Sequence, residues 1–464
     1  MNNYQDRLRN LPSVEKVMNE PKIISLLTQI PRRLIIRTVR DYLEKLRAGI
    51  IAGKPEEFDL LDLVQKVEGL RRPSLKRAIN GLGVVLHTGL GRSPLSRQAQ
   101  AALVEITENF CCLAIDLATG RRGERYSHVD SLLCELTGAE SAMVVNNNAA
   151  ATMLILNTLA ENREVVISRG QLVEIGGAFR MPDVMRRSGA IMVEVGTTNR
   201  THLKDYEQAI NEKTALLMRV HMSNYRIIGF TKEVPLEDLV ALGKKHNIPV
   251  VDDLGSGALI DLSKYGLPKE PMVQESIQTG ADVVCFSGDK LIGGPQAGII
   301  VGKKCYIERM KKNPLTRALR CGKLTYGALE ATLRLFLDEK RLLKEHPLFQ
   351  ILLKPINQMA KEAKSLYKRL AEFIGDSATI NIKDSVSEIG GGSLATESMP
   401  TKVLAIKPKK ITSEELAKRL RYYDPPIFGR IEKDEYLLDF RTIRSDEIAI
   451  IAQALKTIFA NKIS

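Results

Sequence analysis

The middle of the chain alternates short apolar runs with amphipathic stretches. Each run is rich in Val, Ile or Leu, and most have Gly, Asn or Asp at one end, a pattern typical of buried strands. The stretches between them, such as 235–247, have the apolar spacing of helices. Strands are predicted at 141–146, 164–168, 190–196, 214–221, 248–253, 281–288 and 297–302. This alternation predicts an α/β domain with a largely parallel sheet, in which ligands bind where loops leave the carboxyl ends of the strands.

The two ends of the chain have different patterns. Residues 1–78 show only helical periodicity, with Ser13 as the expected N-cap of a helix and an arginine-rich amphipathic stretch over 31–49. After about residue 330, long helices precede a helix at 412–423 capped by Thr412 or Ser413, a strand at 436–443 and a closing helix. We therefore predict a helical domain at 1–78, a large α/β domain at 79–330 and a smaller α/β domain at 331–464.

Composition narrows the class of partner. The 464 residues carry a formal net charge of +13, which favours polyanionic partners or anionic substrates, although a solvated basic surface gives the same value. The sequence has neither an apolar run of membrane-spanning length nor a signal-like apolar core near its start. Six cysteines without a CxxC pair, and no cluster with metal-ligand spacing, indicate a cytoplasmic protein with reduced thiols and no metal.

One lysine stands in an unusual setting, within FSGDKLIGGPQAG at 286–298. Lys290 follows a predicted buried strand, where loss of hydration lowers the pKa of an amine and allows it to form a Schiff base. Ser287, three residues earlier, offers a hydroxyl to an anion. A surface lysine at a strand end is the plain alternative.

Two other strand ends carry polar groups that complete this chemistry. VVDDLGSG places a carboxylate where it can pair with a protonated ring nitrogen; Asp253 is the preferred residue and Asp252 the alternative, unless either is only a turn aspartate. VVNNNAAATMLIL predicts a strand, a turn and a helix start. The free amides of Asn147, Asn148 and Ala149 would cradle a phosphate there, or the asparagines would simply cap a helix.

The order of these features, anion cradle, aspartate and then lysine, matches the pyridoxal-phosphate enzymes of the aspartate-aminotransferase superfamily. Longer segments are more specific. GVVLHTGLGRSPLS, GRRGERYSHVD, SRGQLVEIGGAFRMPDVM, HMSNYRIIGFT and DLGSGALIDLSKYGLPKEP, with the segment around Lys290, resemble the bacterial selenocysteine synthase family, the L-seryl-tRNA(Sec) selenium transferases. The resemblance extends over essentially the whole chain.

The resemblance implies an aspartate-aminotransferase-like (fold-type I) enzyme that converts L-seryl-tRNA(Sec) to L-selenocysteinyl-tRNA(Sec) with selenophosphate. It implies a pyridoxal 5'-phosphate aldimine on Lys290, a ring nitrogen paired with Asp253, and an aminoacrylyl intermediate to which selenium adds. By similarity, Arg92, Arg317 and Arg320 form the selenium-donor site, within one chain or between subunits. Because Arg317 and Arg320 are three residues apart, we expect them on one helix face.

The resemblance also implies that the N-terminal domain binds the tRNA and that the protein is a homodecamer, a pentamer of dimers, with no membrane or DNA partner. Arg122, Arg125 and Tyr126 would border the active site. His128 and His221 are candidate contacts to cofactor or substrate, and Asn224 to the cofactor's phenolic oxygen.

Arg441 suits a different substrate, because related enzymes use such an arginine for a free carboxylate, which a tRNA ester lacks. It would contact the tRNA end, pack structurally, or indicate the first alternative function, a pyridoxal-phosphate lyase acting on a small free amino acid or amino-sugar acid. A non-catalytic tRNA-binding scaffold is the second alternative, and Lys290 and Asp253 argue against it.

Overall fold

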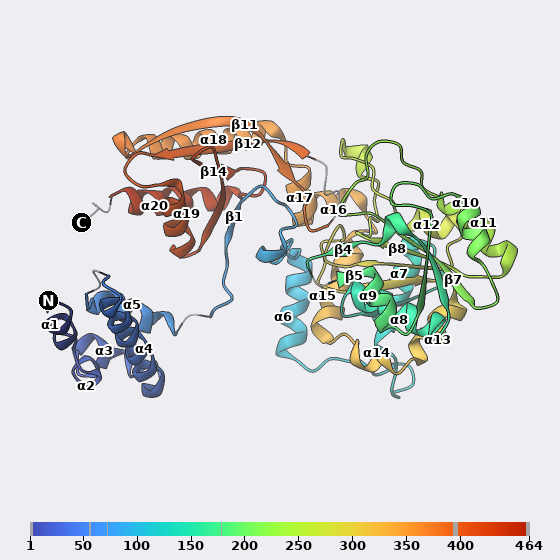
Figure 1. The fold of residues 1–464 in the computed structure, drawn as a ribbon, viewed down its shortest axis with the longest axis horizontal. Coiled ribbons are helices and arrows are strands. Elements are labelled where there is room, and N and C mark those ends of the chain that lie inside the picture. Colours follow the sequence, from blue (N-terminus) through green and yellow to red (C-terminus); the bar gives the residue numbers. More distant parts are fainter. Residues whose placement is uncertain (1–2, 55–56, 72, 178, 393–397, 461–464) are drawn as a thin grey trace. The chain divides into compact units, whose positions relative to one another are not determined.

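The computed structural model describes residues 3–54, 57–71, 73–177, 179–392 and 398–460. The chain forms two compact units, Met1–Arg77 and Ala78–Ser464 (Figure 1). Among the residues described, no helix is both long and apolar enough to cross a membrane.

The first unit is helical, as the sequence predicts. Its longest helix, α4, presents Ile35, Val39 and Leu43 to a small core, where all three are fully buried. The arginines of α4 lie on the exposed side. Ser13 caps α2, accepting a hydrogen bond from the backbone N–H of Lys16, which confirms the predicted N-cap. The helices are α1 (Asn3–Arg9), α2 (Val14–Met18), α3 (Pro21–Leu26), α4 (Arg32–Ile51) and α5 (Leu60–Gly69).

A seven-stranded sheet forms the centre of the second unit. All seven predicted strands are present, in the order β2-β10-β9-β8-β7-β3-β6, and every pairing is parallel except the two that β10 makes. A two-stranded hairpin of β4 (Glu174–Ile175) and β5 (Phe179–Arg180) was not predicted, because strands of two residues have no periodicity. The sheet strands are β2 (Ser141–Val145), β3 (Glu164–Ser168), β6 (Ile191–Val195), β7 (Thr214–Val220), β8 (Val250–Gly255), β9 (Val283–Ser287) and β10 (Gly298–Gly302).

Helices cover both faces of this sheet, which explains why its strands are apolar at nearly every position. In β2, Met143 and Val145 pack into one core and Ala142 and Val144 into the other. The first core also takes α8 (Asn148–Ala160), α9 (Met181–Arg187) and α13 (Lys304–Lys312). The second takes α7 (Asp130–Thr137), α11 (Leu236–His246), α12 (Val273–Thr279), α15 (Lys323–Leu335), α16 (Glu339–Glu345) and α17 (Pro347–Leu352). Helices α6 (Arg97–Glu108), α10 (Leu203–Ala209) and α14 (Leu315–Ala318) complete this part of the chain.

A second sheet is built mainly from the C-terminal residues, in the order β1-β13-β14-β12-β11. The predicted domain boundary assigns 79–81 to the large domain, whereas the structure pairs β1 (Ile79–Gly81) in parallel with β13 of this smaller sheet. Figure 1 shows β1, in blue, beside orange and red strands. Thr412, not Ser413, caps α19. The remaining elements are β11 (Ala378–Glu388), β12 (Ser398–Pro408), β13 (Ile427–Glu432), β14 (Glu435–Asp439), α18 (Ile356–Ala371), α19 (Ser413–Tyr422) and α20 (Ile448–Ala460).

Candidate active site

A cavity of about 310 Å³ opens at the carboxyl ends of β7, β8 and β9, where ligands bind in folds of this kind. Its lining brings together Lys290, Asp253 and Ser287 with the predicted phosphate cradle, Asn147–Ala149. The polar lining residues are Arg92, Asn147, Asn148, His221, Ser223, Asp253, Ser287, Asp289, Lys290 and Gln296; Ala149, Val173, Ile175, Phe179, Met181, Val220 and Gly255 supply the rest.

Lys290 lies in this cavity with only 5% of its surface exposed. Its Nζ donates a hydrogen bond to the carbonyl oxygen of Gly392, 3.3 Å away. Burial, and then the charge of Arg92, lower the pKa of the Lys290 amine from its usual 10.5. Gly255 leaves space beside the amine, since a Cβ there would stand 3.6 Å from Nζ. The amine is therefore more easily deprotonated than that of a surface lysine.

Asp253 is buried in the same wall, 4% exposed, and both its oxygens are engaged. Oδ1 accepts hydrogen bonds from Asn148 Nδ2 at 2.9 Å and from the backbone N–H of Gly255 at 3.0 Å. Oδ2 accepts one from Thr152 Oγ1 at 2.8 Å. Burial outweighs these bonds and raises the pKa of Asp253. A cation bound in the cavity would stabilise the ionised carboxylate.

Asp252 belongs to a different network. Its carboxylate is fully buried, pairs with Arg219 Nη1 at 3.2 Å and accepts a hydrogen bond from Ser276 Oγ at 2.7 Å. Successive side chains of a strand point to opposite faces, and Asp252 is absent from the lining of the Lys290 cavity. Of the two aspartates, the geometry favours Asp253 as the cavity carboxylate.

The N-terminus of α8 forms one end of the cavity. Asn147 is its N-cap: Oδ1 accepts from the backbone N–H of Ala150 at 2.9 Å, and the carbonyl oxygen accepts from Ala151 at 3.1 Å. The backbone N–H groups of Asn148 and Ala149 come before that of Ala150 and have no acceptor within the helix, so they can donate to a bound anion. Ser287 lies in the same lining.

Replacing Gly298 by alanine is expected to loosen this helix start. A Cβ at Gly298 would lie 2.1 Å from the carbonyl oxygen of Asn147, so the helix start or β10 must shift. We expect the free energy of unfolding to fall by about 1–3 kcal/mol and the affinity for a phosphate-bearing ligand to fall with it. Denaturant titration and ligand titration measure the two effects. Gly69→Ala is the control, because a Cβ there meets no neighbour within 4 Å and Gly69, like Gly298, does not have a positive φ; equal loss of ligand affinity in both variants would contradict the prediction.

Arg92 lines the same cavity and contacts two features that sequence reasoning missed. Its Nε pairs with Asp289 Oδ2 at 3.0 Å, and its Nη1 donates to the carbonyl oxygen of Gly391 at 3.1 Å. Asp289 gave no signal beyond its place next to Lys290. The run Gly390–Gly392 could have been noticed in the sequence, because three consecutive glycines predict a turn with backbone angles that other residues rarely adopt. In the structure all three have positive φ.

The expectation that Arg317 and Arg320 share one helix face is wrong. Helix α14 ends at Ala318, and Arg320 lies beyond it in an extended bridge to Val145. Neither arginine is in the lining of the Lys290 cavity. Burial lowers the pKa of Arg320, and the neighbouring charges of Arg125, Arg317 and Arg122 lower it further. The two arginines thus belong to a basic cluster with Arg122 and Arg125, separate from Arg92 within one chain.

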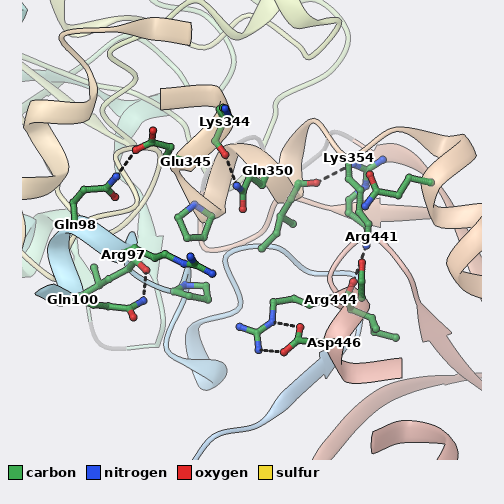
Figure 2. Close-up of a pocket in the computed structure, with 17 residues that line it drawn as sticks. Arg97, Gln98, Gln100, Lys344, Glu345, Gln350, Lys354, Arg441, Arg444 and Asp446 are labelled. Atoms are coloured by element: carbon green, nitrogen blue, oxygen red, sulfur yellow. Dashed lines mark hydrogen bonds and ion pairs between the residues drawn. The ribbon is translucent and has the colours of Figure 1, made fainter. Parts of the chain in front are cut away.

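Arg441 lies elsewhere, in the lining of a larger cavity of about 1170 Å³ (Figure 2). It is 5% exposed, and its guanidinium donates to the carbonyl oxygens of Ile351, Leu352 and Pro400. These bonds tie α17 to β12, so the structure favours the structural role among those considered for Arg441.

The other candidates differ in their positions. His221 lines the Lys290 cavity, whereas His128 contacts the carbonyl oxygen of Leu113 at 3.1 Å. Asn224 donates from Nδ2 to the carbonyl oxygen of Glu174 and is not in the cavity lining. In the portion of the chain that the structure describes, no group of three His, Cys, Asp or Glu side chains is placed to hold a metal ion.

Comparison with known proteins identifies the family of this chain. The family model of L-seryl-tRNA selenium transferase matches residues 78–444, and that of the selenocysteine synthase N terminal matches residues 8–47. The L-seryl-tRNA(Sec) selenium transferase of Carboxydothermus hydrogenoformans is 50% identical, covering 95% of each chain. That of Alkaliphilus oremlandii is 48% identical, covering 97% of this chain and 98% of the relative.

Among solved structures, D-glucosaminate-6-phosphate ammonia-lyase has a similar fold, with a TM-score of 0.59, 20% identity, and coverage of 83% of this chain and 96% of that one. The architecture is the α/β fold with a largely parallel sheet that the sequence predicts. Because the family model covers most of the chain and the relatives are about half identical over nearly its full length, the chain belongs to the L-seryl-tRNA selenium transferase family.

Proposed function

We propose that this protein converts L-seryl-tRNA(Sec) to L-selenocysteinyl-tRNA(Sec) with selenophosphate as selenium donor. The observation that carries the proposal is the cavity in which Lys290 and Asp253 lie together beside the α8 N-terminus, in a chain of this family. The similarity to the ammonia-lyase concerns the fold alone, so a lyase acting on a free amino acid has no specific support.

The cavity fits pyridoxal 5'-phosphate, the cofactor of this family. The amides of Asn148 and Ala149 and the hydroxyl of Ser287 would hold its phosphate, and Asp253 would pair with its ring nitrogen. Asp253 supports this fit directly, because the pKa of its buried carboxyl is raised and a cationic ring nitrogen would restore its charge. When bound, the cofactor withdraws electrons from the Cα of the amino acid attached to it.

Lys290 has two tasks in this proposal. It would attach the resting cofactor covalently, and after release its amine would take the Cα proton of the seryl group. An amine serves as a base only when it is neutral, and the lowered pKa of Lys290 increases the neutral fraction at physiological pH. The contact of Nζ with the carbonyl oxygen of Gly392 orients the amine within the cavity.

Selenophosphate needs cations, which Arg92, Arg317 and Arg320 would supply. Within one chain Arg92 lies in the cavity and the other two do not. We infer that a neighbouring subunit completes the donor site, consistent with a homodecamer built as a pentamer of dimers. The cluster of Arg122, Arg125, Arg317 and Arg320 supports this inference, because like charges held close together are stabilised by a bound anion.

The first unit, residues 1–78 in the predicted division, is proposed to bind the tRNA body of a cytoplasmic substrate. Exposed Arg33, Arg37 and Arg40 lie on the side of α4 opposite its buried residues. The match of 8–47 to the selenocysteine synthase N-terminal family supports this assignment, since RNA phosphates are recognised mainly by such cations.

Changing Arg33, Arg37 and Arg40 together to glutamine is expected to weaken tRNA(Sec) binding and its dependence on salt. Each phosphate that the protein no longer neutralises lowers the slope of log affinity against log salt by about 0.7–0.9, so the slope should fall by about 2. Filter binding at several salt concentrations measures it. The control changes Lys407, Lys409 and Lys410, which are also exposed, to glutamine; an equal effect there would show that only net charge matters.

The proposed function is tested by titrating the purified protein, loaded with pyridoxal phosphate, with seryl-tRNA(Sec) and separately with free serine. We expect only the charged tRNA to change the visible absorption. A response to free amino acids, without one to the tRNA, would favour the lyase.

A further inference from the structure

His221 lies in the cavity wall beside a buried carboxylate that has no task in the proposed roles of Lys290 and Asp253. Its Nε2 lies 3.4 Å from Glu270 Oε1, and Glu270 is only 3% exposed. Ser256, itself fully buried, donates its hydroxyl hydrogen to the same carboxylate oxygen. A carboxylate beside one ring nitrogen orients an imidazole.

The backbone also fixes where this histidine lies. His221 directly follows β7, and its N–H donates to the carbonyl oxygen of Asp253 at 2.8 Å. His221, Asp253 and Lys290 line the same cavity. With Nε2 directed at Glu270, Nδ1 is the nitrogen left to exchange a proton with a bound substrate.

The proposed reaction needs a proton for the departing oxygen as well as a base for the Cα proton. The seryl hydroxyl leaves poorly as hydroxide, whereas a protonated oxygen leaves as water. Lys290 takes a proton from Cα, Asp253 is engaged by Asn148 and Thr152, and Asp289 pairs with Arg92. Serine hydroxyls are too weakly acidic for this task, whereas imidazole titrates near neutral pH. His221 is the group in the lining with suitable chemistry and no competing task.

We propose that His221, positioned by Glu270, donates the proton with which the seryl hydroxyl departs; this inference rests on the proposed function. As the Cα–H bond breaks, its proton goes to Lys290 and its electron pair becomes the second bond between Cα and Cβ. The Cβ–O bond breaks with its pair on oxygen. That oxygen takes the proton of His221 Nδ1 and leaves as water, and His221 becomes neutral. Charge and atoms balance without a further reactant.

The variant His221→Gln separates removal of the Cα proton by Lys290 from protonation of the departing seryl oxygen. The substrate is seryl-tRNA(Sec) with ¹⁸O in its side-chain hydroxyl, in deuterated water and with pyridoxal phosphate bound. We expect the variant to retain cofactor affinity and absorption and to exchange the Cα hydrogen within about twofold of the wild-type rate. Loss of ¹⁸O from the aminoacyl group should fall by about 10²–10⁴-fold, the contribution of general acid catalysis. Mass spectrometry of the released amino acid reports both quantities.

Two further variants distinguish a chemical role from a structural one. Glu270→Gln keeps an oxygen near Nε2 but removes the charge beside the imidazole, so ¹⁸O loss should fall on the order of tenfold with Cα exchange preserved. His246→Gln, at the exposed end of α11, should match the wild type.

Each result of this experiment decides the proposal. Unchanged ¹⁸O loss in His221→Gln would overturn it, as would a parallel fall of ¹⁸O loss, Cα exchange and cofactor affinity. If the wild type itself neither exchanges the Cα hydrogen nor loses ¹⁸O from seryl-tRNA(Sec), the proposed function fails instead, so the two failures are distinguishable.

Discussion

Lys290→Ala is expected to abolish the visible absorption of bound pyridoxal phosphate and to lower selenocysteinyl-tRNA formation by about 10³-fold or more. The variant loses both the covalent attachment of the cofactor and the base for the Cα proton. Absorption spectra and single-turnover assays measure the two effects. A variant that kept the wild-type band and rate would show that another amine holds the cofactor.

The cofactor-free protein provides a control that does not depend on activity. The pKa of Lys290 in the folded protein lies below 10.5, so between the two pKa values the unfolded chain binds more protons. The free energy of unfolding therefore rises with pH through that window and falls as pH drops below 10.5. In Lys290→Met, which has a side chain of similar length, this part of the pH dependence should disappear. Denaturant titrations between pH 7 and 10 compare the two proteins.

Asp253→Asn is expected to have the second largest effect, because it removes charge while leaving the fold nearly intact. The new amide oxygen can accept from Asn148 and from the backbone N–H of Gly255. The new amide nitrogen can donate to Thr152 Oγ1, whose single hydrogen is then free for the carbonyl oxygen of Asn148, 3.0 Å away. Without the carboxylate, the protonated ring nitrogen loses its partner, and turnover should fall on the order of 10²–10³-fold. Single-turnover rates and the absorption maximum measure the loss.

The neighbouring residue is the control for this variant. Asp252→Asn removes the partner of Arg219 and should lower the free energy of unfolding by about 3 kcal/mol, with the absorption of bound cofactor unchanged. If Asp252→Asn altered the absorption maximum and Asp253→Asn did not, the assignment of the ring-nitrogen partner would be reversed.

Local patterns were enough to predict much of this fold and site. The seven strands of the large sheet are apolar because both faces are covered, and parallel strands bring their carboxyl ends to one edge, so Asp253 and Lys290 had to lie near each other. The choice between Asp253 and Asp252 stayed open in the sequence, because the carboxylates are adjacent and only the direction of each side chain separates them.

Features that depend on distant segments could not be predicted in this way. Arg92 contacts Gly391, which lies in a loop almost three hundred residues later in the chain. His221 lies near Glu270 because two loops pack together. No periodicity encodes such pairs. Arg320 illustrates the opposite error, since a three-residue spacing predicts a shared helix face only if the helix continues, and α14 ends first.

The pairing of β1 with β13 has a consequence for synthesis of the chain. The same sheet includes the bond from Arg430 Nη1 to the carbonyl oxygen of Leu82, between residues 348 positions apart. At about 5–20 residues per second, the ribosome needs roughly 20–70 seconds to deliver the partner of β1. During that interval the whole seven-stranded sheet is translated, so the Lys290 cavity can form while the edge of β1 is still unpaired. The nascent chain would therefore form its cofactor-binding region before β1, which follows the N-terminal helices in the sequence, is paired.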